Sequence, residues 1–230
     1  MAESWPTGPR TGRISDRAWP VRVDGGTGNG PDGSALASAR RDRPTGPRTG
    51  PAGGRPLTRL TVAGLTAHVV FELGAGVGMP LASVLGPVAT PSLWALTTGC
   101  VWRIAGAEHA IADALSAMVN GFGIAAVTAH LGGWPTRRTR IGLPWLTECE
   151  GLGSELMPLY NTTLYLSGVT ALLALIREKR TTGPRLPAAM LGLVPVLIAF
   201  QHWEHRRLRR QAHTRPGWWT RRLRRLEPIP

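Results

Sequence analysis

The sequence predicts an all-α protein: a polytopic membrane helical bundle with a disordered basic N-terminal tail and a basic C-terminal tail. The distribution of charge is the first observation behind this prediction. Residues 60–200 hold 8 Lys or Arg and 7 Asp or Glu, residues 1–59 hold 10 Arg and 5 acidic residues, and residues 201–230 hold 9 Arg and 2 acidic residues. An ordinary soluble domain spreads its charges over its surface. The nearly neutral apolar middle between two basic ends therefore excludes that class of protein.

The N-terminal tail, residues 1–57, contains 8 Pro and 11 Gly and no apolar run. Such a composition cannot bury enough surface to offset the entropy of ordering the chain, so we expect disorder. The heptapeptide Pro-Thr-Gly-Pro-Arg-Thr-Gly occurs at residues 6–12 and again at 44–50. Two interpretations stay open: a basic arm that binds anionic lipid or a partner, and a low-complexity extension without its own function.

Five apolar segments form the predicted bundle, residues 58–205. They cover about 60–80, 88–105, 110–132, 157–176 and 187–203. Each approaches the ~20 residues that a helix needs to cross a hydrocarbon core. Tryptophans near segment ends, such as Trp94, Trp134 and Trp203, suit the boundary between lipid headgroups and hydrocarbon. Because Gly86 and Pro87 interrupt its entry, the second segment is either a full span or a half-helix that leaves on the side it entered.

The placement of arginines favours four crossings over five. If the second segment does not cross, Arg55 with Arg59, residues 137–140 and residues 206–210 fall on one side of the membrane. Cytoplasmic loops carry an excess of Lys and Arg, so this topology places both termini in the cytoplasm. Of the 27 basic residues 26 are Arg, in a chain rich in Ala, Gly and Pro, which is typical of a GC-rich bacterial genome. We therefore expect a multi-pass protein of a bacterial cytoplasmic membrane.

The C-terminal tail, residues 206–230, repeats Arg-Arg-Leu-Arg-Arg on either side of Trp218 and Trp219. Arginines interleaved with Trp and Leu favour a segment that lies on an anionic leaflet, and the alternative is a simple topology anchor. The arginines that we expect to face anionic lipid headgroups are Arg206, Arg207, Arg209, Arg210, Arg221, Arg222, Arg224 and Arg225. No nucleic-acid-binding fold surrounds them, so we expect no nucleic acid partner.

Two glycines of the first segment, Gly74 and Gly78, have a GxxxG spacing. Small residues four apart let two helices approach closely. We therefore predict a helix-packing face there, used either within the bundle or for a membrane-protein partner.

Ionisable side chains in the apolar segments are the candidate functional residues, because they are costly in hydrocarbon and face the bundle interior. His68 and Glu72 are four residues apart and share a helix face. With four crossings, we expect a polar cluster near the cytoplasmic face. Its members are His68, Glu72, His130, Tyr160, Asn161 and His202. With five crossings, His68 would lie on one side of the membrane and His130 and His202 on the other.

Two further groups of polar residues stand out. Glu108, His109 and Asp113 form a second candidate cluster, in which His109 and Asp113 repeat the spacing of four. The loop around residues 147–155 adds carboxylates, among them Glu150 and Glu155, which we expect to neutralise the nearby arginines; the alternative is that they join a metal site.

The sequence contains no P-loop, dinucleotide fingerprint, HExxH, GxSxG or CxxC motif, so we do not expect an enzyme. The leading hypothesis is a non-enzymatic accessory or scaffold protein of the membrane, without a cofactor. The first alternative is a redox or transport protein that binds haem or a transition metal through His68, His130 and His202. The second alternative is a small proton-coupled carrier in which Glu72, Glu108 and Asp113 titrate.

Overall fold

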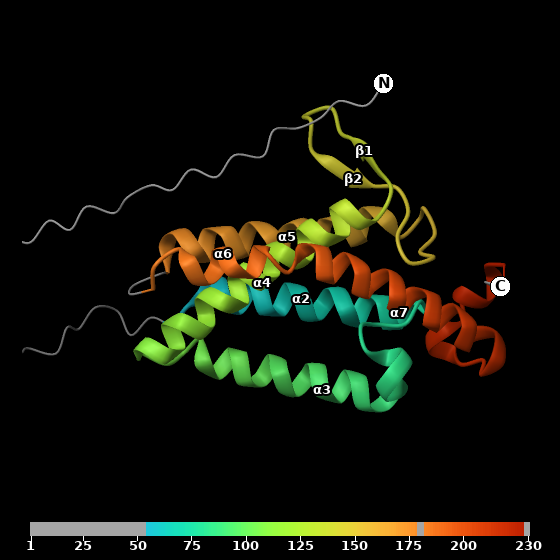
Figure 1. The fold of residues 1–230 in the computed structure, drawn as a ribbon, viewed down its shortest axis with the longest axis horizontal. Coiled ribbons are helices and arrows are strands. Elements are labelled where there is room, and N and C mark those ends of the chain that lie inside the picture. Colours follow the sequence, from blue (N-terminus) through green and yellow to red (C-terminus); the bar gives the residue numbers. More distant parts are fainter. Residues whose placement is uncertain (1–53, 179–181, 228–230) are drawn as a thin grey trace, which may run out of the picture. The chain divides into compact units, whose positions relative to one another are not determined.

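The computed structural model describes residues 54–178 and 182–227, which belong to the unit Thr49–Pro230. The N-terminal tail, residues 1–57, was expected to be disordered, and its residues 1–53 lie outside the described residues. Helices dominate the described residues, as predicted (Figure 1). The long helices are α2 (Pro56–Ala75), α3 (Ala82–Ile104), α4 (Ala110–Gly133), α5 (Met157–Arg177) and α7 (Val194–Thr214). The short elements are α6 (Arg185–Leu191), η1 (Trp218–Thr220), η2 (Leu223–Arg225) and an antiparallel hairpin of β1 (Thr136–Arg138) and β2 (Pro144–Leu146).

Four helical segments of the described chain are long and apolar enough to cross a membrane: α3, α4, α5 and the α6–α7 segment, Arg185–Thr214. This composition is compatible with a membrane protein. The set differs from the predicted one, which included the first apolar segment and left out the second. α3 belongs to the set, whereas α2 does not, and α2 carries Arg59, His68 and Glu72 in its 20 residues.

α3 is long enough to cross a membrane, which favours the full-span interpretation over the half-helix. The backbone kinks at Gly86, where φ is 83°, a conformation that glycine adopts without strain. Pro87 follows the kink directly, so its missing N–H costs little there, as at the first turn of a helix. From Pro87 to Ile104 the helix is about 27 Å long at 1.5 Å per residue, close to the thickness of a hydrocarbon core.

The long helices alternate in direction along the bundle (Figure 1). Arg55, before α2, donates its backbone N–H to the carbonyl of Ala105, after α3, at 2.7 Å. Arg222, after α7, donates its backbone N–H to the carbonyl of Gly76, after α2, at 3.0 Å. The start of α2 and the end of α7 therefore lie at opposite ends of the bundle. The prediction that both termini share one side of the membrane holds only if one of these helices does not cross.

Distant residues cap both ends of α2. The Glu178 carboxylate accepts hydrogen bonds from the Thr58 backbone N–H at 3.0 Å and the Thr58 hydroxyl at 2.7 Å, where the helix dipole favours negative charge. At the other end, the Arg221 guanidinium donates to the Gly74 carbonyl, and Arg222 Nε donates to the Ala75 carbonyl at 3.1 Å. These two arginines bind a helix end, and their contact with lipid headgroups stays a prediction.

Gly74 and Gly78 do not form the predicted packing face within the bundle. α2 ends at Ala75, and Gly76 caps it with a φ of 83°. Gly74 is exposed, and a side chain at this position would meet no atom within 4 Å. Gly78 lies in the loop after the helix with a φ of 91°, against the Leu208 side chain. The glycines therefore end the helix and turn the chain, and they do not line a helix–helix contact.

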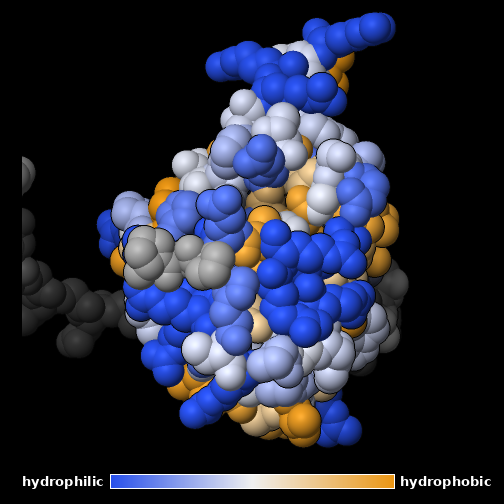
Figure 2. All heavy atoms as spheres, turned by 90° about the vertical axis from the view of Figure 1, so that its right-hand side faces the viewer, coloured by the Kyte–Doolittle hydropathy of each residue, from blue (hydrophilic) through white to orange (hydrophobic). Residues whose placement is uncertain are grey.

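One end of the bundle, here called the arginine-rich end, contains the hairpin, the end of α7 and both 3-10 helices. Its arginines are Arg137, Arg138, Arg140, Arg206, Arg207, Arg209, Arg210, Arg215, Arg221, Arg222, Arg224 and Arg225. Hydrophilic residues cover much of the face seen in Figure 2, and apolar residues show along its edges. The chain does not leave this end as a free tail, because Leu223 is fully buried in the core.

Candidate metal centre

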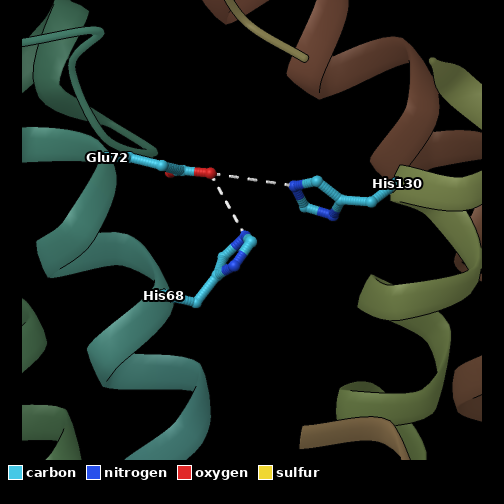
Figure 3. Close-up of side chains that lie close together, drawn as sticks. All are labelled: His68, Glu72 and His130. Atoms are coloured by element: carbon cyan, nitrogen blue, oxygen red, sulfur yellow. Dashed lines mark ion pairs between the residues drawn. The ribbon is translucent and has the colours of Figure 1, made fainter. Parts of the chain in front are cut away.

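Three potential metal ligands come together from two helices near the arginine-rich end. His68 and Glu72 lie one turn apart on α2, and His130 lies in the last turn of α4. Glu72 Oε1 is 3.2 Å from His68 Nε2 and 3.9 Å from His130 Nε2, and the three side chains point toward one another (Figure 3). One ligand atom of each residue lies within 4.8 Å of the others. The rings of His68 and His130 are 5.0 Å apart at an angle of 88°.

The cluster is buried, and part of its hydrogen-bonding capacity is unused. His68 is 4% exposed and Glu72 is 1% exposed. Among the described residues, His68 Nδ1 has no hydrogen-bond partner, and the only polar group near His68 Nε2 is the Glu72 carboxylate, at 3.2 Å. Buried polar atoms without a partner are rare, because each has lost its hydrogen bonds to water. The His68 ring therefore points to a ligand that the protein atoms do not supply.

His130 is held in the tautomer that a metal ligand needs. Its Nδ1 lies 2.9 Å from the Ala126 carbonyl, which can only accept, so Nδ1 carries the proton and donates. Nε2 is then unprotonated and directed at Glu72. A backbone carbonyl that orients the far nitrogen of a histidine is a common arrangement at metal sites.

A chain of hydrogen bonds supports Glu72 from the other side. The Tyr160 hydroxyl donates to Glu72 Oε1 at 2.8 Å, and the Cys149 thiol donates to the Tyr160 oxygen at 3.2 Å. Burial and the neighbouring Glu150 raise the pKa of the Cys149 thiol well above its usual value. Cys149 is therefore held as a neutral donor.

Glu150 belongs to the site, although it comes from the loop between β2 and α5. Its φ is 51°, a left-handed conformation that non-glycine residues seldom adopt and that clusters at functional sites. Burial and the nearby Glu72 carboxylate raise the pKa of Glu150 well above its usual value. Of the two sequence interpretations of the loop carboxylates, joining the site is favoured for Glu150. Glu155 takes the other role and pairs with Arg222 at 2.8 Å.

A cavity of about 250 Å³ opens beside the cluster. Its wall is mostly apolar and comes from α2, α3, α4, α7, the loop after α2 and the loop between β2 and α5. His68, Glu72 and His130 form part of its polar wall. Glu204 and His205 of α7 line the same cavity, and His205 Nδ1 is buried without a hydrogen-bond partner among the described residues.

The sequence analysis did not single out Glu204 or His205 as members of the cluster. A usable pattern was present, since Gln201, Glu204, His205 and Leu208 follow the i, i+3, i+4, i+7 spacing of one helix face. All four residues line the cavity.

The structure does not place His202 or Asn161 with the three ligands. The His202 ring lies 4.8 Å from that of Trp134, and His202 is outside the group of ligand atoms. Asn161 receives the Leu146 backbone N–H at 2.9 Å and donates to the Leu146 carbonyl at 3.1 Å, so it ties β2 to α5. The expectation that five crossings separate His68 from His130 is wrong as well. α2 and α4 run in the same direction, and α2 ends at Ala75, so His68 lies in its second half.

The second predicted cluster lies at the opposite end of the bundle and forms no comparable group. His109 Nδ1 accepts the Ala112 backbone N–H at 3.1 Å and caps α4. Asp113 forms a buried ion pair with Arg55, and Glu108 is exposed. Glu108 and Asp113, which the carrier hypothesis names as titrating groups together with Glu72, therefore lie at the other end of the bundle from Glu72.

Comparison of the chain with protein-family models, with curated proteins and with solved structures finds no match.

Proposed function

We propose that this chain is a membrane protein that binds one divalent transition-metal ion through His68, Glu72 and His130. The observation that carries this proposal is the buried group of two imidazoles and one carboxylate, whose ligand atoms lie within 4.8 Å of one another. Zinc and iron sites commonly use this set of ligands, with a further position open to water or substrate. A tetrahedral ion with ligand bonds of ~2.1 Å needs ligand atoms roughly 3.4 Å apart, close to the spacing around Glu72.

The unpaired buried nitrogen favours an ion over a closed hydrogen-bonded cluster. Glu72 Oε1 accepts from the Tyr160 hydroxyl and lies 3.2 Å from His68 Nε2, yet His68 Nδ1 lacks a hydrogen-bond partner in the described chain, so the protein atoms do not close the cluster. Glu72 and Glu150 also place two carboxyl groups in one buried site, where burial and the Glu72 carboxylate raise the pKa of Glu150. A bound cation would favour the ionised form of both groups.

The geometry favours a single ion over haem. The two histidine rings are perpendicular and only 5.0 Å apart, which leaves no room for a porphyrin between them. The alternative that His68 and His130 share a haem is therefore not supported, and the haem hypothesis gives way to the metal-ion hypothesis.

Metal analysis of point variants tests the proposal. The purified protein, in detergent, would be dialysed against Zn(II), Co(II), Mn(II) or Fe(II), and its metal content measured by mass spectrometry. We expect near-stoichiometric metal in the wild type and its loss in His68→Ala, Glu72→Gln and His130→Ala. His202→Ala is the matched control, since its ring lies against Trp134, and it should keep the metal.

Circular dichroism and size-exclusion chromatography would check that each variant keeps its helices. Wild-type protein that takes up none of these ions, or the same uptake in all four variants, would overturn the proposal. A non-enzymatic accessory role would then be the better explanation of the chain.

We further propose that the arginine-rich end faces the cytoplasm and meets anionic lipid headgroups. Arg206, Arg207, Arg210, Arg224 and Arg225 are exposed at this end. Arginines near an anionic leaflet contribute about 1 kcal/mol each, and Lys and Arg concentrate on the cytoplasmic side. The metal centre would then lie toward the cytoplasmic half of the bundle.

A further inference from the structure

We infer that the cavity beside the metal centre binds an uncharged, lipid-soluble molecule with a hydroxyl head group and an apolar tail. The inference rests on the proposed metal site, because the ion would hold the hydroxyl oxygen at its open position. The observation behind it is a mostly apolar cavity whose polar lining consists of carboxylates, imidazoles and the amide of Gln201.

The cavity has space for the head group of such a molecule, and an adjoining hollow has space for its apolar tail. Its volume is about 250 Å³, whereas an engineered apolar cavity of roughly 150 Å³ holds benzene. A second hollow of about 310 Å³ lies against it, and Leu65, Trp94 and Phe122 line both. This hollow runs between α3 and the faces of α2 and α4 and has an almost wholly apolar lining. An extended apolar tail fits along it.

α3 covers the second hollow with few buried side chains. Only Ala82, Ser83 and Thr90 of α3 are buried, all in its first nine residues. Its remaining length has side chains that are exposed or half-buried within the protein. In a bilayer these side chains meet lipid, so a lipid-soluble molecule can reach the cavity from the membrane along α3.

The polar wall selects the charge of the head group. Glu72, Glu150 and Glu204 line the cavity, and its lining in the described chain includes no Lys or Arg. Glu204 already accepts the Ser83 backbone N–H at 2.8 Å and the Ser83 hydroxyl at 2.5 Å. A carboxylate or an ammonium head would lose its hydration in this mostly apolar cavity, which costs far more than the burial of a hydroxyl. A hydroxyl supplies an oxygen for the ion and a proton that a carboxylate of the lining can accept.

Three ligands with the same ten-carbon chain test the inference: 1-decanol, decanoate and decylamine. Radiolabelled 1-decanol would be bound to metal-loaded wild-type protein in nanodiscs, with empty nanodiscs as the partition blank. We expect saturable binding of one 1-decanol per protein, and competition by decanoate and decylamine that is weaker by about tenfold or more.

Cavity-filling variants locate the binding site. Leu197→Trp and Ala126→Trp fill the cavity from α7 and α4 and should weaken 1-decanol binding by about tenfold. Leu172→Trp, on the exposed face of α5, is the matched control and should bind normally. Leu197→Trp should keep its metal, which separates loss of the cavity from loss of the ion.

The two proposals fail in different ways. Stoichiometric metal in the wild type without saturable 1-decanol binding would overturn this inference and leave the metal site standing. Binding of 1-decanol that is unchanged in metal-free protein would overturn the role of the ion as its anchor. Preference for decylamine or decanoate, or unchanged binding in both cavity variants, would overturn the assigned ligand or its place.

Discussion

The Tyr160 hydroxyl donates a hydrogen bond of 2.8 Å to Glu72 Oε1, and both side chains are almost completely buried. The bond joins α5 to α2 and fixes the carboxylate in the orientation that faces His68 and His130. A hydrogen bond to a metal-binding carboxylate typically changes metal affinity by about 10- to 100-fold.

The Tyr160→Phe variant should therefore keep its fold and lose metal affinity by about tenfold or more. Removal of one hydroxyl leaves the ring packing against His68 in place, at 4.5 Å between ring centroids. Zn(II) affinity, measured by competition with a chelating dye, checks the expectation. Tyr165→Phe is the control, because its hydroxyl binds the Pro144 carbonyl away from the site. Equal affinity in both variants would show that Tyr160 does not position Glu72.

Glu178→Gln should destabilise the protein by about 1–2 kcal/mol, because the first turn of α2 loses a charged cap. The carboxylate meets the Leu57 and Thr58 backbone N–H groups and the Thr58 hydroxyl. Thermal unfolding in detergent, followed by circular dichroism, measures the change. Glu108→Gln removes an exposed carboxylate before α4 and should have little effect. A Glu178→Gln variant as stable as Glu108→Gln would contradict this account of the cap.

Leu223→Ala should destabilise the protein by about 2–5 kcal/mol, because it removes a fully buried side chain and leaves a cavity. Trp218→Ala lies in the same C-terminal segment but is 57% exposed, so it should cost much less. Unfolding midpoints of the two variants would be compared. If they agree, the C-terminal segment does not pack on the core as described here.

The ion pair of Glu155 and Arg222 should stabilise the protein only above the acidic range. The Glu155 backbone N–H and the Arg222 guanidinium lower the pKa of Glu155 below its usual 4.5. A carboxylate whose pKa is lowered by folding contributes stability above 4.5 and loses it as the pH falls through the lower, folded-state value. The difference in unfolding midpoint between wild type and Glu155→Gln should therefore shrink with decreasing pH. Since the pair is exposed, the difference should be small, and one that grows in acid would refute the assignment.

Topology reporters check the orientation. If the arginine-rich end faces the cytoplasm, as proposed, fusions of alkaline phosphatase at residues 107 and 182 should be active, and fusions at residue 140 and at the C-terminus should be inactive. The reverse pattern would refute the orientation. Activity at residue 182 without activity at residue 107 would show that α3 does not cross.

The sequence by itself determined the class of this protein and part of its site. Apolar segments of about 20 residues between basic ends predict a helical bundle. Length and composition alone decide whether a segment can form a helix that spans a membrane, and both are read directly from the sequence. The spacing of His68 and Glu72 predicts one shared helix face, since helical geometry relates residues four apart. The structure places both of them with His130, at the distances given above.

Only the tertiary structure decided which residues meet. The kink at Gly86 lets α3 continue as a helix through Pro87. Because α2 ends at Ala75, His68 lies in the second half of that helix, beside His130. Glu150, Glu204 and His205 reach the cavity from a loop and from α7, and Arg221 and Arg222 return to cap a helix about 147 residues earlier. These contacts join segments far apart in the chain, and their formation depends on the packing of whole helices, which no local pattern specifies.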